Sequence, residues 1–222
     1  MKVRLIARTE GVGDLKGKTI GEMLAYVARV SNPSNQHNDK TAARLLTYCL
    51  RNQHWSVFET ASITMEITTS RAITQQIVRH WSCRFQEFSQ RYSEVVGFEI
   101  YEARRQDDKN RQNSIDDLSE KTKEWFRKSQ EFVNGVCLEL YKAALSKGIA
   151  KEQARFLLPL STQATIYMTG NIRSWITYCD IRGIKPGAQL EHREIALAAL
   201  DILLQEVPEL TEYFNDSKDG NG

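Results

Sequence analysis

The sequence predicts an α+β fold in which long helices pack on a small, mainly antiparallel sheet. Residues 62–68 alternate apolar and polar side chains with a period of two, which is typical of a half-buried strand, and residues 163–169 repeat the pattern. Residues 118–147 instead carry apolar side chains at helical spacing, which predicts one long helix. Strand and helix do not alternate along the chain as they do in a parallel sheet, so we expect the strands to pair antiparallel.

Shorter stretches of the same two patterns predict the remaining elements. Residues 2–8 are expected to form a first strand. Helices are expected over residues 19–30, 39–51, 71–80, 151–158, 172–182 and 188–205. Gly148 and Pro159 end the helices that precede them, and Asn171 is a suitable N-cap for the helix that follows it.

Three segments carry neither pattern. Residues 81–92 are interpreted as irregular, and residues 104–117, which are rich in Arg, Gln, Asp and Asn, are expected to form a surface loop. Residues 217–222 are expected to form a disordered tail. The sequence contains neither an internal repeat nor a low-complexity linker, so residues 1–222 are interpreted as a single domain.

Composition excludes several classes of protein. The formal net charge of +2 argues against general nucleic-acid binding. The cysteines form no C-x-x-C pair, which predicts free thiols in a reducing cytosol and therefore a cytoplasmic protein. The N-terminus has no apolar signal-peptide core, and no apolar stretch reaches the roughly 18 residues that a membrane span requires. The histidines lack metal-ligand spacing, so no metal site is expected.

Polar side chains are densest in residues 79–92. Arg79, Arg84 and Arg91 stand there among hydroxyl and amide side chains, directly after an apolar helix. Guanidinium groups bind phosphate oxygens through pairs of hydrogen bonds, so this segment is a candidate site for a phosphate-bearing ligand. The alternative is an ordinary basic surface loop.

A second polar set lies far away in the sequence and comprises Arg155, Asn171, Arg173 and Arg182. Asn171 and Arg173 open a predicted helix, and a helix N-terminus attracts anions. Arg182 closes that helix, and the alternative for it is that it only complements the negative end of the helix dipole.

Two common kinds of catalytic or nucleotide site are excluded by their motifs. The sequence contains no G-x-S-x-G motif, which argues against a serine hydrolase. It also contains no G-x-G-x-x-G motif or other Gly-rich phosphate loop after a strand, which excludes a Rossmann-type site.

The segment 79–92 also resembles a known family. Arg79-His80-Trp81, followed by seven residues and Ser89, resembles the signature of flavin-dependent thymidylate synthases, which is Arg-His-Arg, seven residues and Ser. Gln90-Arg91-Tyr92 continues as that family does. The likeness extends in order over most of the chain, through Ala28-Arg29-Val30-Ser31, Phe58-Glu59, Gln76, Ala154-Arg155, Leu157-Leu158-Pro159, Asn171, Arg173-Ser174, Arg182, Ala188-Gln189 and Glu191.

The resemblance implies an enzyme that methylates dUMP to dTMP, with FAD in a non-Rossmann flavin site, 5,10-methylenetetrahydrofolate as carbon donor and NADPH as reductant. It also implies a homotetramer whose active sites are shared between subunits. The implied dUMP-binding residues are Gln76, Arg79, Glu87, Phe88, Ser89, Gln90, Arg91, Arg155 and Arg182. The implied FAD-binding residues are Arg79, His80, Trp81, Ser82, Glu87, Asn171 and Arg173.

Within these sets the resemblance implies different roles. Arg182 is the implied catalytic residue, which stabilises negative charge on the pyrimidine as its N3 region ionises. Arg91 and Arg155 clamp the phosphate, and Phe88 lies against the nucleotide through its backbone. Ser89 is interpreted as a hydrogen-bond donor to phosphate rather than as a nucleophile, because no adjacent base is evident to activate it.

Three positions depart from the family pattern. Trp81 replaces the third Arg of the signature, which removes a charge and offers a stacking surface. Thr60 and Gly187 each stand where His is common, and the stretch after Arg182 is one residue longer. These departures leave open a non-catalytic nucleotide-binding protein on the same fold. A further alternative, an arginine-rich RNA-binding module, is disfavoured by the near-neutral net charge.

Overall fold

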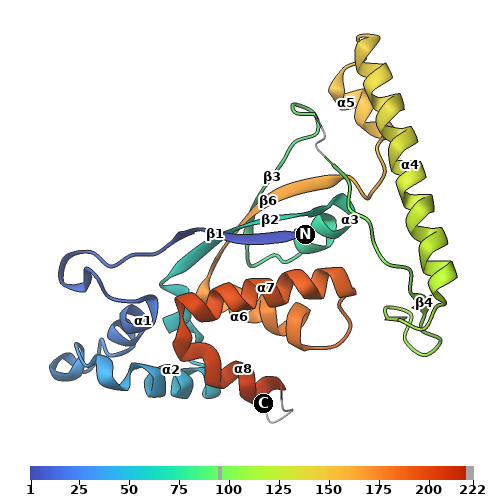
Figure 1. Cartoon of the computed structure of the whole chain (residues 1–222). Coiled ribbons are helices and arrows are strands. Elements are labelled where there is room, and N and C mark those ends of the chain that lie inside the picture. Colours follow the sequence, from blue (N-terminus) through green and yellow to red (C-terminus); the bar gives the residue numbers. More distant parts are fainter. Residues whose placement is uncertain (95–96, 219–222) are drawn as a thin grey trace.

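A four-stranded antiparallel sheet forms the centre of the computed structural model, which describes residues 1–94 and 97–218 (Figure 1). Its strands, in spatial order, are β1 (Lys2–Arg8), β2 (Ser62–Ser70), β6 (Gln163–Asn171) and β3 (Arg84–Glu87). Every neighbouring pair runs antiparallel. The predicted small antiparallel sheet is therefore confirmed.

The two strands that the sequence predicted most clearly form the middle of this sheet. β2 and β6 pair residue for residue along their whole length. Met65 lies opposite Met168, and both are completely buried, because the period-two pattern turns alternate side chains toward the core. On the other face the hydroxyl groups of Thr64 and Thr169 are hydrogen-bonded at 2.9 Å.

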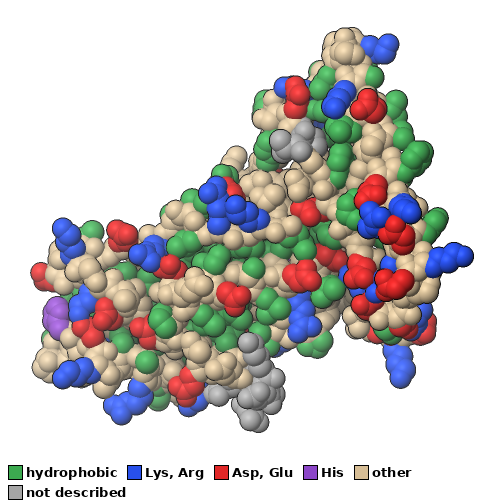
Figure 2. Space-filling view, viewed as in Figure 1, with side chains coloured by type: hydrophobic (Ala, Val, Ile, Leu, Met, Phe, Trp, Pro, Cys, Tyr) green, Lys and Arg blue, Asp and Glu red, His purple; other side chains and the backbone are tan. Residues whose placement is uncertain are grey.

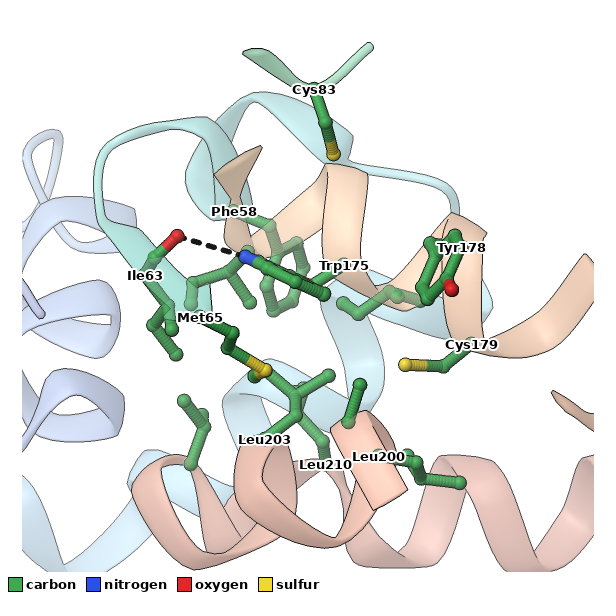
Figure 3. Packing of buried hydrophobic residues seen from close by; sticks show 14 of the residues in the cluster. Phe58, Ile63, Met65, Cys83, Trp175, Tyr178, Cys179, Leu200, Leu203 and Leu210 are labelled. Carbon is green, nitrogen blue, oxygen red and sulfur yellow. Dashed lines mark hydrogen bonds between the residues drawn. The ribbon is translucent and has the colours of Figure 1, made fainter. Parts of the chain in front are cut away.

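Helices pack around the sheet and extend beyond it. They are α1 (Ile20–Ala28), α2 (Ala42–Arg51), α3 (Arg71–Ile77), α4 (Glu120–Ser146), α5 (Lys151–Ala154), α6 (Ile172–Cys179), α7 (Leu190–Glu206) and α8 (Thr211–Lys218). α6 and α7 lie against one face of the sheet (Figure 1). Trp175 of α6 is completely buried there, and its indole Nε1 donates a hydrogen bond to the carbonyl of Ile63 in β2 at 3.0 Å (Figure 3).

Residues 81–92 contain a strand that the sequence prediction missed. β3 lies within this segment and pairs with β6. Phe85 is the only apolar residue of β3, so apolar periodicity could not indicate a strand. The strand forms because the edge of β6 offers backbone groups that need hydrogen-bond partners.

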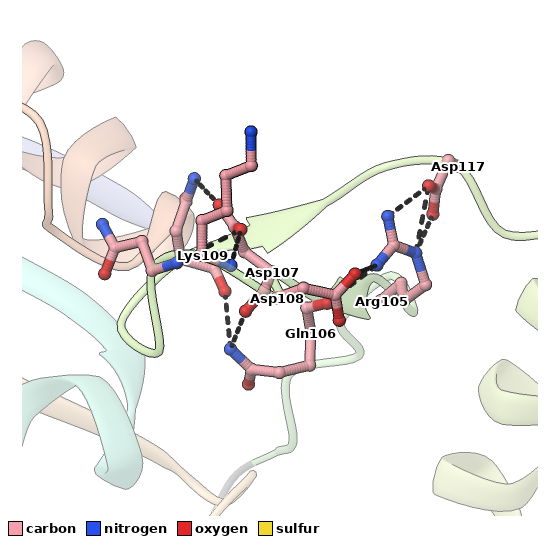
Figure 4. A network of polar contacts seen from close by, with 8 residues as sticks. Arg105, Gln106, Asp107, Asp108, Lys109 and Asp117 are labelled. Carbon is pink, nitrogen blue, oxygen red and sulfur yellow. Dashed lines mark hydrogen bonds and ion pairs between the residues drawn. The ribbon is translucent and has the colours of Figure 1, made fainter.

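Residues 104–117 include a short hairpin, in contrast to the plain loop that was expected. β4 (Arg105–Gln106) pairs antiparallel with β5 (Ser114–Ile115). Arg105 donates hydrogen bonds to both carboxylate oxygens of Asp117, and Asp107 accepts one from the backbone N–H of Lys109 at 2.8 Å (Figure 4). Polar side-chain contacts therefore organise this segment.

The last described helix, α8, was not predicted. It packs on α2, and Phe214 within it is buried. The expected tail over residues 217–222 starts inside this helix, and residues 219–222 lie outside the described part of the chain.

α4 forms an arm that stands away from the sheet (Figure 1). The predicted long helix is confirmed, but most of its apolar stripe faces solvent: Trp125 is 66% exposed and Phe132 is 73% exposed. Figure 2 shows apolar side chains on the surface of this arm. Its apolar face is therefore not part of the core of the single chain. Over the described residues, no helix combines the length and the apolar character that a bilayer crossing requires.

Candidate active site

A cavity of about 530 Å³ brings together part of each of the two polar sets that lie far apart in the sequence. It is lined by Glu59, Arg79, His80, Trp81, Ser82, Arg84, Asn171, Arg173, Ser174, Thr177, Ile181 and Arg182. The segment before β3 forms one wall, and α6 with the turn that follows it forms the other. We call this space the Arg182 cavity.

The start of α6 is organised as the sequence predicted. Asn171 caps the helix, since its Oδ1 accepts a hydrogen bond from the backbone N–H of Ser174 at 2.9 Å. Arg173 forms an ion pair with Glu59 and lies over the ring of Trp55, 5.6 Å from its centroid. Asn171 and Arg173 both line the cavity, so the N-terminus of α6 and the Arg173 side chain belong to the same wall.

Arg182 lies on a π-helical turn, Asp180–Ile184, in contrast to the regular helix that was expected over residues 172–182. π turns are rare and occur frequently at functional sites. Arg193 of α7 holds this turn by donating a hydrogen bond from Nε to the carbonyl of Gly183 at 3.0 Å. Within the described residues Arg182 donates to no helix carbonyl, and its Nε is buried without a partner, which argues against the helix-capping alternative.

Three aromatic side chains form the wall behind Arg182. The ring centroid of Tyr178 lies 5.3 Å from that of His80 and 5.8 Å from that of His192. Burial, together with the charge of Arg182 and the neighbouring His80, lowers the pKa of His192 to about 4. Burial also lowers the pKa of His80, against a backbone hydrogen bond at Ser174 that raises it. Both rings are therefore neutral at pH 7.

The Arg182 cavity fits the anionic, aromatic cofactor that the resemblance implies. Four arginines line it against one glutamate, which favours phosphate groups. His80 Nε2 and Ser82 Oγ are buried without a hydrogen-bond partner among the described residues, and such groups in native proteins are usually satisfied. Trp81 is 87% exposed at the same cavity and offers its indole face for stacking.

Two of the departures from the family pattern have a local structural account. Gly187 has a φ of 108°, which favours glycine over histidine at this position. Thr60 follows the 3₁₀ helix Trp55–Glu59, and its hydroxyl donates to the carbonyl of Val57 at 2.8 Å.

Glu87, the last residue of β3, and Phe88, which follows it, do not line the Arg182 cavity, whereas Arg84 at the start of β3 does. Glu87 accepts a hydrogen bond from Arg71 at 3.1 Å, and it does not line that cavity, although the resemblance implied contacts with both ligands. The backbone N–H of Phe88 donates to Thr165 at 2.8 Å, so only the carbonyl of Phe88 remains for a ligand.

The implied phosphate residues gather around a second, smaller cavity. This cavity has a volume of about 210 Å³ and is lined by Arg71, Gln90, Arg155, Phe156, Leu158, Pro159 and Leu160. Gln90 is only 4% exposed, and its Nε2 has no partner among the described residues. Arg91 pairs with the carboxylate of Glu152 at 3.3 Å, and Arg155 donates to the carbonyl of Glu152 at 3.1 Å. Ser89 Oγ accepts the backbone N–H of Arg91 at 3.3 Å.

The structure thus divides the predicted site into two regions. Arg155 follows α5 at the end of the α4 arm, whereas α6 lies beneath the sheet, so the two regions are well separated within one chain (Figure 1). Gln76 belongs to neither cavity lining, and its side chain donates to Gln189 at 2.7 Å.

Sequence reasoning did not single out Arg71, Tyr178 or His192. His192 shares the buried face of α7 with Ile195, and a histidine in such an apolar register was the available signal. Arg71 and Tyr178 carried no comparable signal.

Comparison with known proteins adds independent information. Residues 18–209 match the family model Thy1, described as thymidylate synthase complementing protein. The chain is 50% identical over 214 residues to a probable flavin-dependent thymidylate synthase of Paramecium bursaria Chlorella virus 1, covering 96% of this chain and 98% of the relative. It is 50% identical over 210 residues to a flavin-dependent thymidylate synthase of Synechocystis sp., covering 94% and 96%. The fold is similar to the crystal structure of the UMP/dUMP methylase PolB from Streptomyces cacaoi, bound with 5-Br dUMP, with a TM-score of 0.83, 24% identity and coverage of 96% and 94%.

Proposed function

The chain belongs to the flavin-dependent thymidylate synthase family, and from that premise we propose how its residues divide the work of the reaction. The enzyme is an FAD-dependent methyltransferase that converts dUMP to dTMP. The observation that supports our assignment of residues is the Arg182 cavity, which brings the signature segment to the start of α6. When bound and reduced by NADPH, the flavin would supply the hydride that reduces the one-carbon unit from 5,10-methylenetetrahydrofolate.

We assign the flavin to the Arg182 cavity. Arg79, His80, Trp81, Ser82, Asn171 and Arg173 would hold it, since all of them line this space. The guanidinium groups and the N-terminus of α6 suit its diphosphate, and Trp81 offers a stacking surface in place of the usual third arginine. Glu87 is left out of this set because it lies at Arg71 instead.

Arg182 acts on the uracil ring. As the N3 region of the ring ionises, negative charge spreads over N3 and O4 and makes C5 nucleophilic. C5 then forms the new carbon–carbon bond, and its hydrogen leaves as a proton. We propose that the Arg182 guanidinium stabilises that charge without reorganising, and the π turn held by the hydrogen bond from Arg193 supports this role. Because His80 and His192 are neutral, neither ring adds a second positive charge next to the Arg182 guanidinium. Burial raises the pKa of Cys83 to about 12, so this neighbouring thiol is not a nucleophile at neutral pH.

The dUMP phosphate belongs to the second cavity. Arg91 and Arg155 both contact Glu152, Arg91 at its carboxylate and Arg155 at its backbone carbonyl, which supports their role as a phosphate clamp. Buried Gln90 has a free amide for a phosphate or sugar oxygen, and Ser89 would donate its hydroxyl hydrogen. Gln76, Arg79, Glu87 and the carbonyl of Phe88 complete the nucleotide set.

The separation of the two regions supports a homotetramer with shared sites. Because the two regions are well separated within one chain, we propose that Arg155 of one subunit serves the Arg182 cavity of another. The exposed apolar face of α4, with Trp125 and Phe132, supplies a surface that association would bury. We further propose a cytosolic enzyme, which suits four free cysteines, and NADPH as the reductant of the flavin.

Release of tritium from [5-³H]dUMP tests this function. Purified protein with FAD, NADPH and methylenetetrahydrofolate should release tritium to water and form dTMP. The matched control omits the folate. A protein that binds dUMP and FAD yet releases no tritium would be the non-catalytic nucleotide-binding alternative.

A further inference from the structure

A buried ion pair stands next to the nucleotide-binding residues and has no role in the function proposed so far. Arg104 Nη2 and Glu191 Oε1 lie 2.5 Å apart, and their side chains are only 12% and 5% exposed. Ser114 in the β4–β5 hairpin accepts a second hydrogen bond from Arg104, at 2.9 Å from Nε. Burial works to raise the pKa of Glu191, but the hydrogen bonds from Arg104 and Gln189 lower it below its ordinary value. Glu191 is therefore a carboxylate, and a carboxylate only accepts hydrogen bonds.

This carboxylate fixes the direction of a chain of hydrogen bonds. Gln189 has to turn its NH₂ group to Glu191, and Nε2 lies 2.8 Å from Oε2. The oxygen of Gln189 then faces away and accepts a hydrogen bond from Nε2 of Gln76 at 2.7 Å. The two ends of an amide side chain are ordinarily hard to tell apart, but an anion at the end of the chain allows only one arrangement.

We propose that the relay Arg104–Glu191–Gln189–Gln76 sets the amide of Gln76 so that its oxygen is presented to the nucleotide as a hydrogen-bond acceptor. The proposal rests on the proposed function, which places dUMP at Gln76. Arg104, Glu191 and Gln189 are then positioning residues, and Gln76 determines specificity by accepting from a donor on the substrate.

The chemistry of dUMP limits what that donor is. Apart from the phosphate, dUMP carries two donors, the N3–H of uracil and the 3′-hydroxyl group. An analogue without the matching hydrogen leaves the oxygen of Gln76 unpaired, which is how sites built to bind a polar hydrogen reject close analogues. The oxygen of Gln76 would therefore accept a hydrogen bond from one of these two groups, the N3–H or the 3′-hydroxyl.

The test compares nucleotide affinities of full-length, FAD-loaded protein by titration calorimetry. The ligands are dUMP, 3-methyl-dUMP, which lacks the N3–H, and 2′,3′-dideoxy-UMP, which lacks the 3′-hydroxyl. The variants are Gln189→Leu, which cuts the relay at an exposed residue, and Glu191→Gln, which removes the anion. Glu194→Gln, the same chemical change at an exposed position of α7, is the matched control.

We expect the wild-type protein and Glu194→Gln to prefer dUMP over one analogue by about tenfold, and that analogue identifies the donor. Gln189→Leu should weaken dUMP binding about three- to tenfold while leaving that analogue nearly unchanged, so the preference contracts. Glu191→Gln should do the same where it folds. If Glu191→Gln does not fold, Gln189→Leu still tests the proposal, because the Arg104–Glu191 pair remains intact in that variant.

Two results would overturn the proposal. If Gln189→Leu retains the wild-type preference for dUMP over both analogues, the relay does not orient Gln76. If it weakens all three nucleotides equally, the relay only supports the local structure. Failure of the proposed function is a different result, because the wild-type protein itself would then either not bind dUMP or bind it without releasing tritium.

Discussion

The Arg182 cavity and the region around Arg155 differ in how firmly the chain holds their arginines. Arg182 lies on a π turn that Arg193 pins to α7, and its neighbours Tyr178 and His192 are buried. Arg155 instead follows the four-residue helix α5 at the end of an arm, and its neighbour Glu152 is half exposed. The difference teaches that one chain alone holds the Arg182 guanidinium in place, whereas we expect the proposed phosphate contacts of Arg155 to tighten when subunits associate.

The rigidity of the first region comes from the core directly beneath it. Trp175 and Tyr178, on α6, are both completely buried, and Cys179 packs beside them (Figure 3). Since packed cores resist deformation, the turn that follows α6 inherits a fixed position. The helix α5 has few such contacts, because its cluster comprises little more than Tyr141, Ala144 and Ala154.

The largest expected effect belongs to Arg182. Arg182→Lys keeps the positive charge but loses the planar guanidinium. We expect it to fold and bind FAD, yet to lose at least about a hundredfold in dTMP formation, since a preorganised charge is worth about 3–4 kcal/mol in the barrier. Flavin reduction by NADPH should be nearly unchanged. Stopped-flow reduction and tritium release measure the two steps.

The matched control is Arg44→Lys, at an exposed position of α2. Both steps should remain at the wild-type rate in it. Near-normal dTMP formation by a folded Arg182→Lys enzyme would mean that the cavity does not act through this guanidinium, and the contrast between the two regions would lose its catalytic meaning.

The second prediction measures how deeply the Arg182 region is buried. His192 has a pKa of about 4 when folded and about 6.5 when unfolded. Between these values the unfolded chain binds more protons, so stability falls as the pH falls through this window, by up to about 3 kcal/mol. His192→Leu removes this contribution and should flatten the pH dependence. Urea unfolding between pH 7.5 and pH 4.5 measures both slopes.

His192→Leu should stay folded at pH 7.5, because a neutral, buried ring is replaced by an apolar side chain. Equal slopes in the variant and the wild-type protein would show that His192 titrates as an exposed group. The Arg182 region would then be as open to solvent as the Arg155 region.

Sequence patterns predicted those parts of the fold that local rules specify. The alternation in β2 and β6 and the cap at Asn171 depend on neighbouring residues alone, and all three were confirmed. β3 and the β4–β5 hairpin depend on partners distant in sequence or on polar side-chain contacts, which periodicity does not report. The apolar stripe of α4 predicted a helix correctly, but periodicity alone cannot say what covers such a stripe.

The candidate site shows the same limit. The resemblance supplied much of the lining of the Arg182 cavity, because motifs such as Arg79-His80-Trp81 can be recognised as short stretches of sequence. It did not indicate that Glu87 turns to Arg71, or that a π turn carries Arg182. It also gave no role to His192, whose contacts with Tyr178 arise only when α7 packs on α6.

The third prediction concerns the Arg155 region. Arg155→Ala removes one charge from the implied clamp and should weaken dUMP binding by about 1.5–3 kcal/mol, the range for a hydrogen bond to a charged group. Deoxyuridine, which has no phosphate, should bind the variant and the wild-type protein equally. Calorimetry with the two ligands measures this difference. Arg91→Ala should show the same pattern, because Arg91 gives up only a half-exposed pair with Glu152 when it turns to phosphate.

Equal weakening of dUMP and deoxyuridine would place Arg155 away from the phosphate. The second cavity would then be a structural feature of the arm, and Gln90 would need another partner.

The last prediction asks whether the two regions meet in the assembled enzyme, and it concerns the smallest signal. Chains carrying Arg155→Ala and chains carrying Arg182→Ala are co-expressed and assayed for tritium release at low dUMP concentration, where each variant alone is nearly inactive. If a site takes Arg182 from one chain and Arg155 from another, random assortment restores about one site in four. The control pairs Arg79→Ala with Arg182→Ala, which line the same cavity of one chain and should recover nothing. Recovery in neither pair would break the division of the site between subunits, because the two regions would then have to serve a reaction within a single chain. Recovery in the control pair alone would also contradict it, because Arg79 and Arg182, rather than Arg155 and Arg182, would then reach one site from different chains.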